Sequence, residues 1–398
     1  MMTNKIYRLH NQTKNYEWGS LKLIPEFLGK ETSGNIPYAE MWMGTHESVP
    51  SQVDTPLSGI GNTGKIPLKE ISGELPFLFK LLAVEKPISI QAHPNKEKAA
   101  EGFRLEEETG VNLRSPLRNY KDPNHKPELL CALSRFSLMA GFKDFDIISK
   151  SLNEFLIVFP QLKEVISPLQ RSLNTGSLAV FLRILFNFSK FEKEYMCDLI
   201  TKKEIIGKSD IIIPEQWALI KTFASQYPED PTILAPLYLN YLTLQPGQFI
   251  YIPSGVLHSY INGFGIELMT SSDNVLRGGL TPKHIDIPEL MNILDFKPYN
   301  PKIFSPAFTS WFCYGSENFS LIIMEGDGQE RVFPGKGPAI CLVTDGELIV
   351  EGLTFVKGES FFIPKDNEEL IFSGKYSAFV ASGVPPSSIT ASPEFAML

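Results

Sequence analysis

The sequence has few cysteines, and they lie far apart. Its 398 residues include four, namely Cys131, Cys197, Cys313 and Cys341, and no two of them form a C-x2-C pair. This absence argues against a zinc site built from thiolates and against a disulfide framework, because both need organised cysteine pairs. We therefore interpret all four as buried free thiols.

Long apolar runs and runs of positive charge are also missing. No segment approaches the roughly 18 to 20 apolar residues of a membrane-spanning helix, and no early basic segment precedes a stretch with the length of a signal peptide. The formal net charge is -8, without a cluster of Lys and Arg. The sequence therefore predicts a cytoplasmic protein that binds neither a membrane nor a nucleic acid.

What is present is a large apolar fraction whose periodicity changes along the chain. Hydrophobic residues make up 43% of the sequence, enough for a large core and for two or three domains. Short apolar runs separated by turn residues predict strands in 1–145 and 226–298, which we expect to form one barrel. Helical spacing in between predicts an α-helical insertion over 146–225. Alternating runs such as 339–352 predict a second β domain over 299–398.

Three short strings contain residues that suit a metal site. They are QAHPNK at 91–96, NHKPEL at 124–129 and PSGVLHSYING at 253–263. Strand side chains alternate between faces, so the Gln91-x-His93 pair puts both side chains on one face. Together with Glu128 and His258, these residues could close around one divalent metal. Two imidazoles, a carboxylate and a carboxamide suit zinc, although the same donors also suit iron or manganese.

The third string matches a known barrel signature. From Gly247 the chain reads G-x5-P-x-G-x2-H-x3-N, which is the second signature of the cupin barrels. This spacing has a physical reason. A short apolar strand is followed by a tight turn at Pro253 and Gly255, and the next strand then directs His258 inward. Gly358-x5-Pro364 echoes it without the later Gly and His, which suggests a degenerate cupin-like C-terminal domain, though turn chemistry explains this echo almost as well.

Longer strings resemble one family, the type I phosphomannose isomerases, also called type I mannose-6-phosphate isomerases. These are zinc enzymes that interconvert mannose 6-phosphate and fructose 6-phosphate. The resemblance is strong over about 5–145 and 225–295. The strings that carry it are NYEWGS (15–20), YAEMWMGTHES (38–48), ISIQAHPNKE (88–97), DPNHKPELLCAL (122–133) and ELMTSSDNVLRGGLTPKHID (267–286).

This resemblance implies a mainly β fold of cupin-type double-stranded β-helix (jelly-roll) barrels, a monomer, and one Zn²⁺ per chain held by Gln91, His93, Glu128 and His258. It also implies that Arg277 acts in the transition state and that Lys80, Lys126 and Lys283 lie in the active site. We expect the catalytic residues to be Arg277, Lys126, Lys80 and Asp273, and the substrate-binding residues to be Lys283, Ser89, Glu267, Tyr260 and Glu40. A lysine within the apolar FLFKLL should face a polar cavity, since burial without a partner is costly.

Simpler interpretations and other functions stay open at this point. His258 could be a core histidine, Glu128 could pair only with Lys126, and Arg277 or Lys283 could form a loop salt bridge with Asp273 or Asp286. The remaining histidines, His10, His46, His125 and His284, are expected at the surface or in support of the site. The alternative functions are a metal cupin of other chemistry and a sugar-phosphate-binding cupin without turnover. The group that takes the C2 proton is a metal-bound hydroxide, a lysine or a carboxylate.

Overall fold

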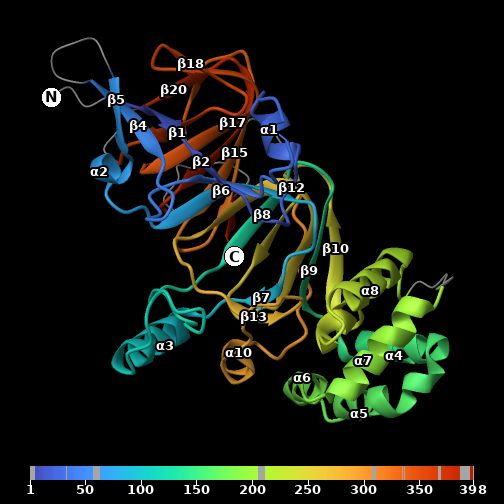
Figure 1. Ribbon diagram of the computed structural model, residues 1–398. Coiled ribbons are helices and arrows are strands. Elements are labelled where there is room, and N and C mark those ends of the chain that lie inside the picture. Colours follow the sequence, from blue (N-terminus) through green and yellow to red (C-terminus); the bar gives the residue numbers. More distant parts are fainter. Residues whose placement is uncertain are drawn as a thin grey trace.

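The protein consists of two β bodies and a group of helices beside them (Figure 1). The structure is a computed structural model, and it describes residues 5–32, 34–56, 63–204, 211–306, 311–333, 335, 337–365, 369–385 and 395–397. Two antiparallel sheets of ten and twelve strands form the β bodies, apart from one parallel pair at an edge of the larger sheet. The mainly β prediction is confirmed.

The ten-stranded sheet carries the predicted barrel strands. Its main path runs β10-β9-β12-β6-β3-β2, with β11 and β8 paired to each other and β7 and β13 paired at the lower end in Figure 1. The long strand β12 pairs with β6, β7, β8 and β9 and so connects most of the barrel. The strands are β2 (Gln12–Lys14), β3 (Glu40–Met43), β6 (Phe77–Val84), β7 (Ile90–Ala92), β8 (Glu128–Ala132), β9 (Phe136–Phe142), β10 (Leu239–Leu244), β11 (Phe249–Ile252), β12 (His258–Thr270) and β13 (Leu276–Gly279).

Two local features of this sheet set the direction of its side chains. Gly255 has a φ of 83°, which a glycine adopts without steric cost, and the turn there leads β11 into β12 as predicted. Within β12 the pairing with β9 shifts between Tyr260 and Asn262, which is a β-bulge. An extra residue in one strand reverses the alternation beyond it. Consequently Tyr260 before the bulge and Glu267 after it both point into the barrel, where each contributes to one buried polar group.

The helices between β9 and β10 follow the predicted change of period. They are α4 (Phe145–Val158), α5 (Lys163–Leu173), α6 (Leu178–Phe186), α7 (Lys190–Lys202) and α8 (Pro214–Gln226), followed by the short elements η2 (Pro231–Leu234) and α9 (Ala235–Tyr238). The apolar run 178–200 is two helices, because Ser189 caps α7: its hydroxyl accepts from Glu192 N, and the Glu192 carboxylate accepts from Ser189 N. None of the described helices has the length and apolarity that crossing a membrane requires.

Four further helices lie close to the barrel strands in sequence. Helix α1 (Leu23–Phe27) and helix α2 (Lys69–Ser72) are short, and α3 (Lys96–Glu108) is the predicted charged helix. Asn95 caps α3 by accepting from Lys98 N, and Gly110 follows its end with a φ of 72°. Helix α10 (Ile287–Ile293) lies against β13 at the lower end of the barrel (Figure 1).

The second sheet combines the C-terminal segment with strands from the N-terminus. Strand β1 pairs with β19 through Tyr7 opposite Phe362, and β4 and β5 follow at that edge. The sequence has no histidine beyond His284, so the strands that the C-terminal segment adds to this sheet carry none, and His10 Nε2 on β1 lies 3.0 Å from Asp54 Oδ2 at the sheet's other part. Its strands are β1 (Tyr7–His10), β4 (Gln52–Pro56), β5 (Thr63–Pro67), β14 (Trp311–Gly315), β15 (Ser320–Asp327), β16 (Arg331–Val332), β17 (Ala339–Val350), β18 (Leu353–Val356), β19 (Ser360–Ile363), β20 (Ile371–Ser373), β21 (Lys375–Ser382) and β22 (Phe395–Met397).

The apolar cores join these bodies. One cluster unites the helices α4–α8 with residues of β7 and β13, so the helical core continues onto one end of the barrel. A second fills the space between the two sheets. The four cysteines are buried and free, as predicted.

A buried lysine marks the junction between the barrel and the helices. Lys143, directly after β9, is 7% exposed, and its Nζ donates to Pro236 O at 2.8 Å. Gln216 donates to the same carbonyl at 2.7 Å. Burial lowers the pKa of Lys143 to about 8, whereas an unfolded lysine titrates near pH 10.4.

We expect Lys143→Met to remove a pH dependence from the folding free energy. Between about pH 8 and pH 10.4 the unfolded chain holds the Lys143 proton and the folded chain releases it, so stability rises with pH across this window by up to about 3 kcal/mol. Urea unfolding at pH 7 to 10 should show this rise in the wild type and its loss in Lys143→Met. The exposed Lys150→Met is the control; equal slopes in all three proteins would contradict the assignment.

Candidate metal centre and active site

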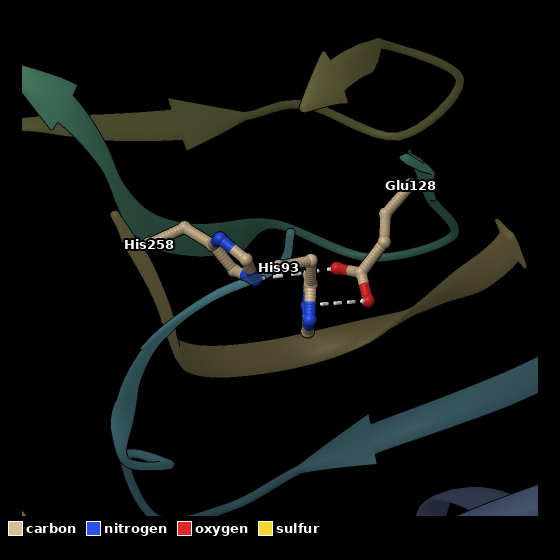
Figure 2. Close-up of side chains that lie close together, drawn as sticks. All are labelled: His93, Glu128 and His258. Atoms are coloured by element: carbon tan, nitrogen blue, oxygen red, sulfur yellow. Dashed lines mark ion pairs between the residues drawn. The ribbon is translucent and has the colours of Figure 1, made fainter. Parts of the chain in front are cut away.

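Three buried side chains from separate strands meet inside the barrel. His93 follows β7, Glu128 begins β8 and His258 begins β12. Their functional ends point toward one another in Figure 2, and all three are at most 2% exposed. The strand register brings them together, because His258 lies opposite Gln91 across β12 and β7, while Glu128 lies opposite Ile252, the last residue of the strand β11 that leads into β12.

The donor atoms lie at distances that suit a shared cation. His93 Nε2 is 3.1 Å from Glu128 Oε1, and His258 Nε2 is 3.3 Å from Glu128 Oε2. One donor atom from each residue lies within 4.8 Å of the other two. An ion at the centre of such a group can contact all three donors.

The other nitrogen of each imidazole faces a backbone carbonyl. His93 Nδ1 is 2.7 Å from Asn274 O, and His258 Nδ1 is 3.0 Å from Val256 O. A carbonyl only accepts hydrogen bonds, so each Nδ1 carries a proton, and in the neutral imidazole the Nε2 atom is left with a lone pair. Both Nε2 atoms therefore present lone pairs to a carboxylate, and His93 Nε2 has no hydrogen-bond partner within the described residues. A cation satisfies all of these atoms, and carbonyl-anchored imidazoles are typical of metal sites.

Gln91 is the fourth member of the predicted donor set. Its side-chain Nε2 lies 3.3 Å from His258 Nε2. The oxygen and nitrogen of a carboxamide exchange places by rotation about the last side-chain bond. The rotated amide presents its oxygen to the same point as the imidazoles, so the structure fits a set of two nitrogens and two oxygens.

The protonation states of the cluster favour metal binding. Burial, and next the Lys126 ammonium, lower the pKa of His93 to about 4. Burial alone would raise the pKa of Glu128, but His93 and Lys126 hold it well below the usual value. At pH 7 the imidazole is therefore neutral and the carboxylate is ionised, which are the states that bind metals.

A second buried polar group lies next to this cluster. Lys80 Nζ is 2.9 Å from Glu267 Oε2 and 3.7 Å from Glu40 Oε1, and it lies 5.2 Å from the Trp42 ring centroid. Burial would lower the pKa of Lys80, but the two carboxylates raise it, so the lysine is protonated. Trp42 Nε1 donates to Glu40 Oε2 at 2.6 Å. Lys80 is thus buried with charged partners, while the polar cavity expected beside it stays a prediction.

Tyr260 and Lys126 connect the two groups. The Tyr260 hydroxyl donates to Glu128 Oε2 at 3.1 Å, and Lys126 Nζ is 3.2 Å from Glu128 Oε1. Burial raises the pKa of Tyr260 well above its usual value, and Glu128 and Glu267 add to the effect. The phenol is thus a hydrogen-bond donor at neutral pH. Glu128 contacts His93 and His258 as well as Lys126, so the simple pairing with Lys126 alone is excluded.

The loop salt bridges considered for Arg277 and Lys283 are absent from the described residues. Asp273 pairs with His46 Nε2 at 3.1 Å, and Asp286 caps α10 by accepting from Glu289 N. Arg277 lies half-buried in β13, opposite Gln91 in the strand register. The Lys283 side chain is exposed at the surface, but partial burial of its ammonium lowers the pKa of Lys283, and the nearby charges of Arg277 and Lys121 lower it further. These three cations therefore lie near one another.

Sequence reasoning did not single out Asn274, and it named His46 only as a residue at the surface or in support of the site. His46 holds Asp273, and its ring lies 4.7 Å from that of Trp42. Asn274 contributes the carbonyl that orients His93, and its side chain accepts from Lys121 N at 2.7 Å. His46 lies inside YAEMWMGTHES and Asn274 inside the 267–286 string. These strings indicated that both regions belong to the site, but they did not indicate which residues the two side chains contact. The substrate candidate Ser89 lies half-buried just before β7.

Fold and site together define a metal-binding cupin, a barrel with imidazole and carboxylate donors in its interior. Residues 6–145 match the family model described as phosphomannose isomerase type I, catalytic domain. The mannose-6-phosphate isomerase of Escherichia coli (strain K12) is 32% identical over 387 residues, covering 92% of this chain and 97% of that protein. Mannose-6-phosphate isomerase 2 of Arabidopsis thaliana is 31% identical, covering 92% of this chain and 90% of that protein.

Solved structures agree with these relatives. The mannose 6-phosphate isomerase of Salmonella typhimurium, crystallised with fructose 6-phosphate and zinc, superposes with a TM-score of 0.84 at 30% identity, covering 96% of this chain and 100% of that one. The apo form of the same enzyme gives the same score. The chain belongs to the type I phosphomannose isomerase family.

Replacing Lys80 by Met should destabilise the fold strongly. The change leaves Glu267 and Glu40 buried without their cation, and breaking a buried pair on one side costs about 3 to 5 kcal/mol. Urea unfolding measures the loss. Adding Glu267→Gln to Lys80→Met should recover part of it, because the unpaired charge is removed. Lys69→Met, which breaks the exposed Lys69–Glu74 pair, is the matched control. A loss in Lys80→Met no greater than in this control would contradict the prediction.

Proposed function

We propose that this chain is a zinc-dependent mannose-6-phosphate isomerase that interconverts mannose 6-phosphate and fructose 6-phosphate. The observation that carries the proposal is the convergence of His93, Glu128 and His258 beside the buried Lys80, Lys126 and Glu267. Membership of the family and the likeness to an enzyme crystallised with fructose 6-phosphate and zinc support the same reaction.

Within this proposal, one Zn²⁺ is held by His93 Nε2, His258 Nε2, a Glu128 oxygen and the Gln91 carboxamide oxygen. The two carbonyl-bound Nδ1 atoms and the low pKa of His93 support this set. When bound, the metal supplies Lewis-acid polarisation of the sugar oxygens at C1 and C2.

The reaction needs a proton to leave C2 and a proton to arrive at C1, with stabilisation of the two adjacent oxygens in between. We assign the cations to this charge: Arg277 beside Gln91, and Lys126 beside Glu128. Lys80 and Asp273 complete the proposed catalytic group. Both are held by partners within the chain, Lys80 by Glu267 and Asp273 by His46.

The remaining candidates are assigned to substrate binding. Lys283 and Ser89 suit the phosphate, since an ammonium and a hydroxyl both donate to phosphate oxygens. Glu40, Glu267 and Tyr260 suit the sugar hydroxyls, because buried carboxylates and a phenol fix the direction of polar contacts. Phosphate binding energy then orients the reacting carbons.

We also propose the organisation and setting of the enzyme. Residues 1–145 and 226–298 form the catalytic barrel, 146–225 the helical insertion and 299–398 the C-terminal domain. The β1 pairing with β19 links the first and last of these. A cytoplasmic setting is supported by the four free buried thiols, and a monomer is the state that the family resemblance implies.

Removing an imidazole should remove metal and activity together. Wild type should contain about one zinc per chain by elemental analysis, and a coupled assay should show conversion of mannose 6-phosphate that a chelator abolishes. His258→Ala should lose the metal and at least about 10³-fold in kcat/KM. The exposed His284→Ala is the control and should retain both. Turnover by a metal-free His258→Ala protein would refute the proposal.

Arg277→Ala should lower kcat/KM by about 10²- to 10³-fold with the zinc content unchanged, as expected for the loss of a cation that stabilises developing negative charge. Arg277→Lys should retain part of the activity. Arg104→Ala, which breaks an exposed pair with Glu108 on α3, serves as the control and should behave like wild type. An Arg277→Ala enzyme with wild-type kcat/KM would remove Arg277 from the mechanism.

A further inference from the structure

The end of β13 has a constrained backbone. Gly279 has a φ of 145° and Leu280 a φ of 53°, and the second is a left-handed conformation that a residue with a side chain adopts only at an energetic cost. A Cβ on Gly279 would lie 1.8 Å from Thr232 Oγ1. The segment that follows Arg277 is therefore pressed against η2, and only a glycine permits the approach.

A single carboxylate holds this approach in place. Asp230 Oδ2 accepts from Leu280 N at 2.6 Å, while Asp230 Oδ1 accepts from Thr232 N at 2.8 Å and from Thr232 Oγ1 at 2.6 Å. Hydrogen bonds to an ionised acceptor are stronger than neutral ones. Asp230 thus ties the strained Leu280 to the short element that ends the helical segment.

Strand β13 contacts the helices through apolar packing on one side and the barrel through strand pairing on the other. Leu276 and Leu280 are each 2% exposed and belong to the same apolar cluster as Ile233 and the helices α4–α8. On its other side β13 pairs with β7, where Arg277 lies opposite Gln91. Within the described residues, no side chain pairs with the Arg277 guanidinium. The backbone of β13 therefore sets where the Arg277 Cα lies, and with it the region that the guanidinium can reach.

The surroundings leave room for this segment to move if the bonds are lost. A cavity of about 450 Å³ borders Asp230, and its wall includes Tyr227 of the helical side and Thr281 and Ile285 of the chain after Leu280. A segment next to an open cavity has no packed neighbour to hold it in place from that side.

We propose that Asp230, with Thr232, is a positioning residue for Arg277, so that the segment between α8 and β10 influences catalysis in the barrel through this contact. The inference rests on the proposed function, in particular on the role of Arg277. The carboxylate contacts no reacting group; it acts on the reaction through three residues of backbone. Displacing a reacting group by about 1 Å can cost about 10²-fold in rate.

A double-mutant cycle between Asp230 and Arg277 tests the inference. We expect Asp230→Ala to lower kcat/KM by about 10- to 100-fold, chiefly through kcat, in the presence of Arg277. In the Arg277→Ala background the same change should cost less than about 3-fold, because the group that it positions is gone. Zinc content should stay at the wild-type level in both backgrounds.

Three further measurements separate positioning from general damage. Asp230→Asn keeps the shape and one acceptor, so it should give an intermediate kcat and serves in place of Asp230→Ala if that variant does not fold. Asp198→Ala removes a carboxylate on the surface of α7 that pairs, among the residues the structure describes, with Lys202, and it should leave kcat unchanged. Circular dichroism and thermal unfolding report whether each variant is folded.

The possible outcomes distinguish the inference from the proposed function. Equal losses from Asp230→Ala with and without Arg277 would overturn the positioning role while leaving the function intact, and so would a loss confined to stability. A fully active Arg277→Ala enzyme would overturn the role of Arg277 and this inference with it. The inference is supported if Asp230→Ala lowers kcat/KM when Arg277 is present and has little effect when Arg277 is replaced by Ala.

Discussion

The site depends on two hydrogen bonds from imidazole Nδ1 atoms to backbone carbonyls. Asn274 O and Val256 O fix the protons of His93 and His258 on the far sides of the rings. Both Nε2 lone pairs then face the Glu128 carboxylate, which also has only lone pairs to offer. Such a group is unfavourable in a dry interior unless a cation lies within it. The backbone carbonyls of the barrel thus orient the imidazoles so that the site favours a bound metal.

The buried charges around this centre limit what the pocket can accept. Three carboxylates, Glu40, Glu128 and Glu267, lie with two ammonium groups, Lys80 and Lys126. The divalent metal turns this excess of one negative charge into an excess of one positive charge, before Arg277 is counted. A site with this balance attracts an anionic sugar and stabilises negative charge on its oxygens. The tight pairing of Lys80 also means that its proton is held firmly at neutral pH.

The sequence predicted the parts of the site that depend on short-range spacing. The turn at Gly255 and the inward direction of His258 follow from the motif, and the helical period of 146–225 predicted helices where they occur. Contacts between distant segments were beyond such reasoning. Nothing in local spacing indicates that Asn274 O orients His93 or that His46 holds Asp273, because these contacts form only when the strands are in register. The salt bridges considered between Arg277 and either Asp273 or Asp286 were wrong for the same reason.

The β-bulge between Tyr260 and Asn262 lets the single strand β12 contribute side chains both to the metal centre and to the group around Lys80. His258 and Tyr260 lie on the inner face before the bulge. Glu267 lies on the same face after the bulge, although its position is nine after that of His258. In a regular strand an odd separation would send Glu267 outward, away from Lys80. A single surplus residue therefore unites the metal centre with the lysine–glutamate pair. Insertions or deletions in this part of β12 would exchange inside for outside along half its length, which makes its length, as much as its composition, a requirement of the enzyme.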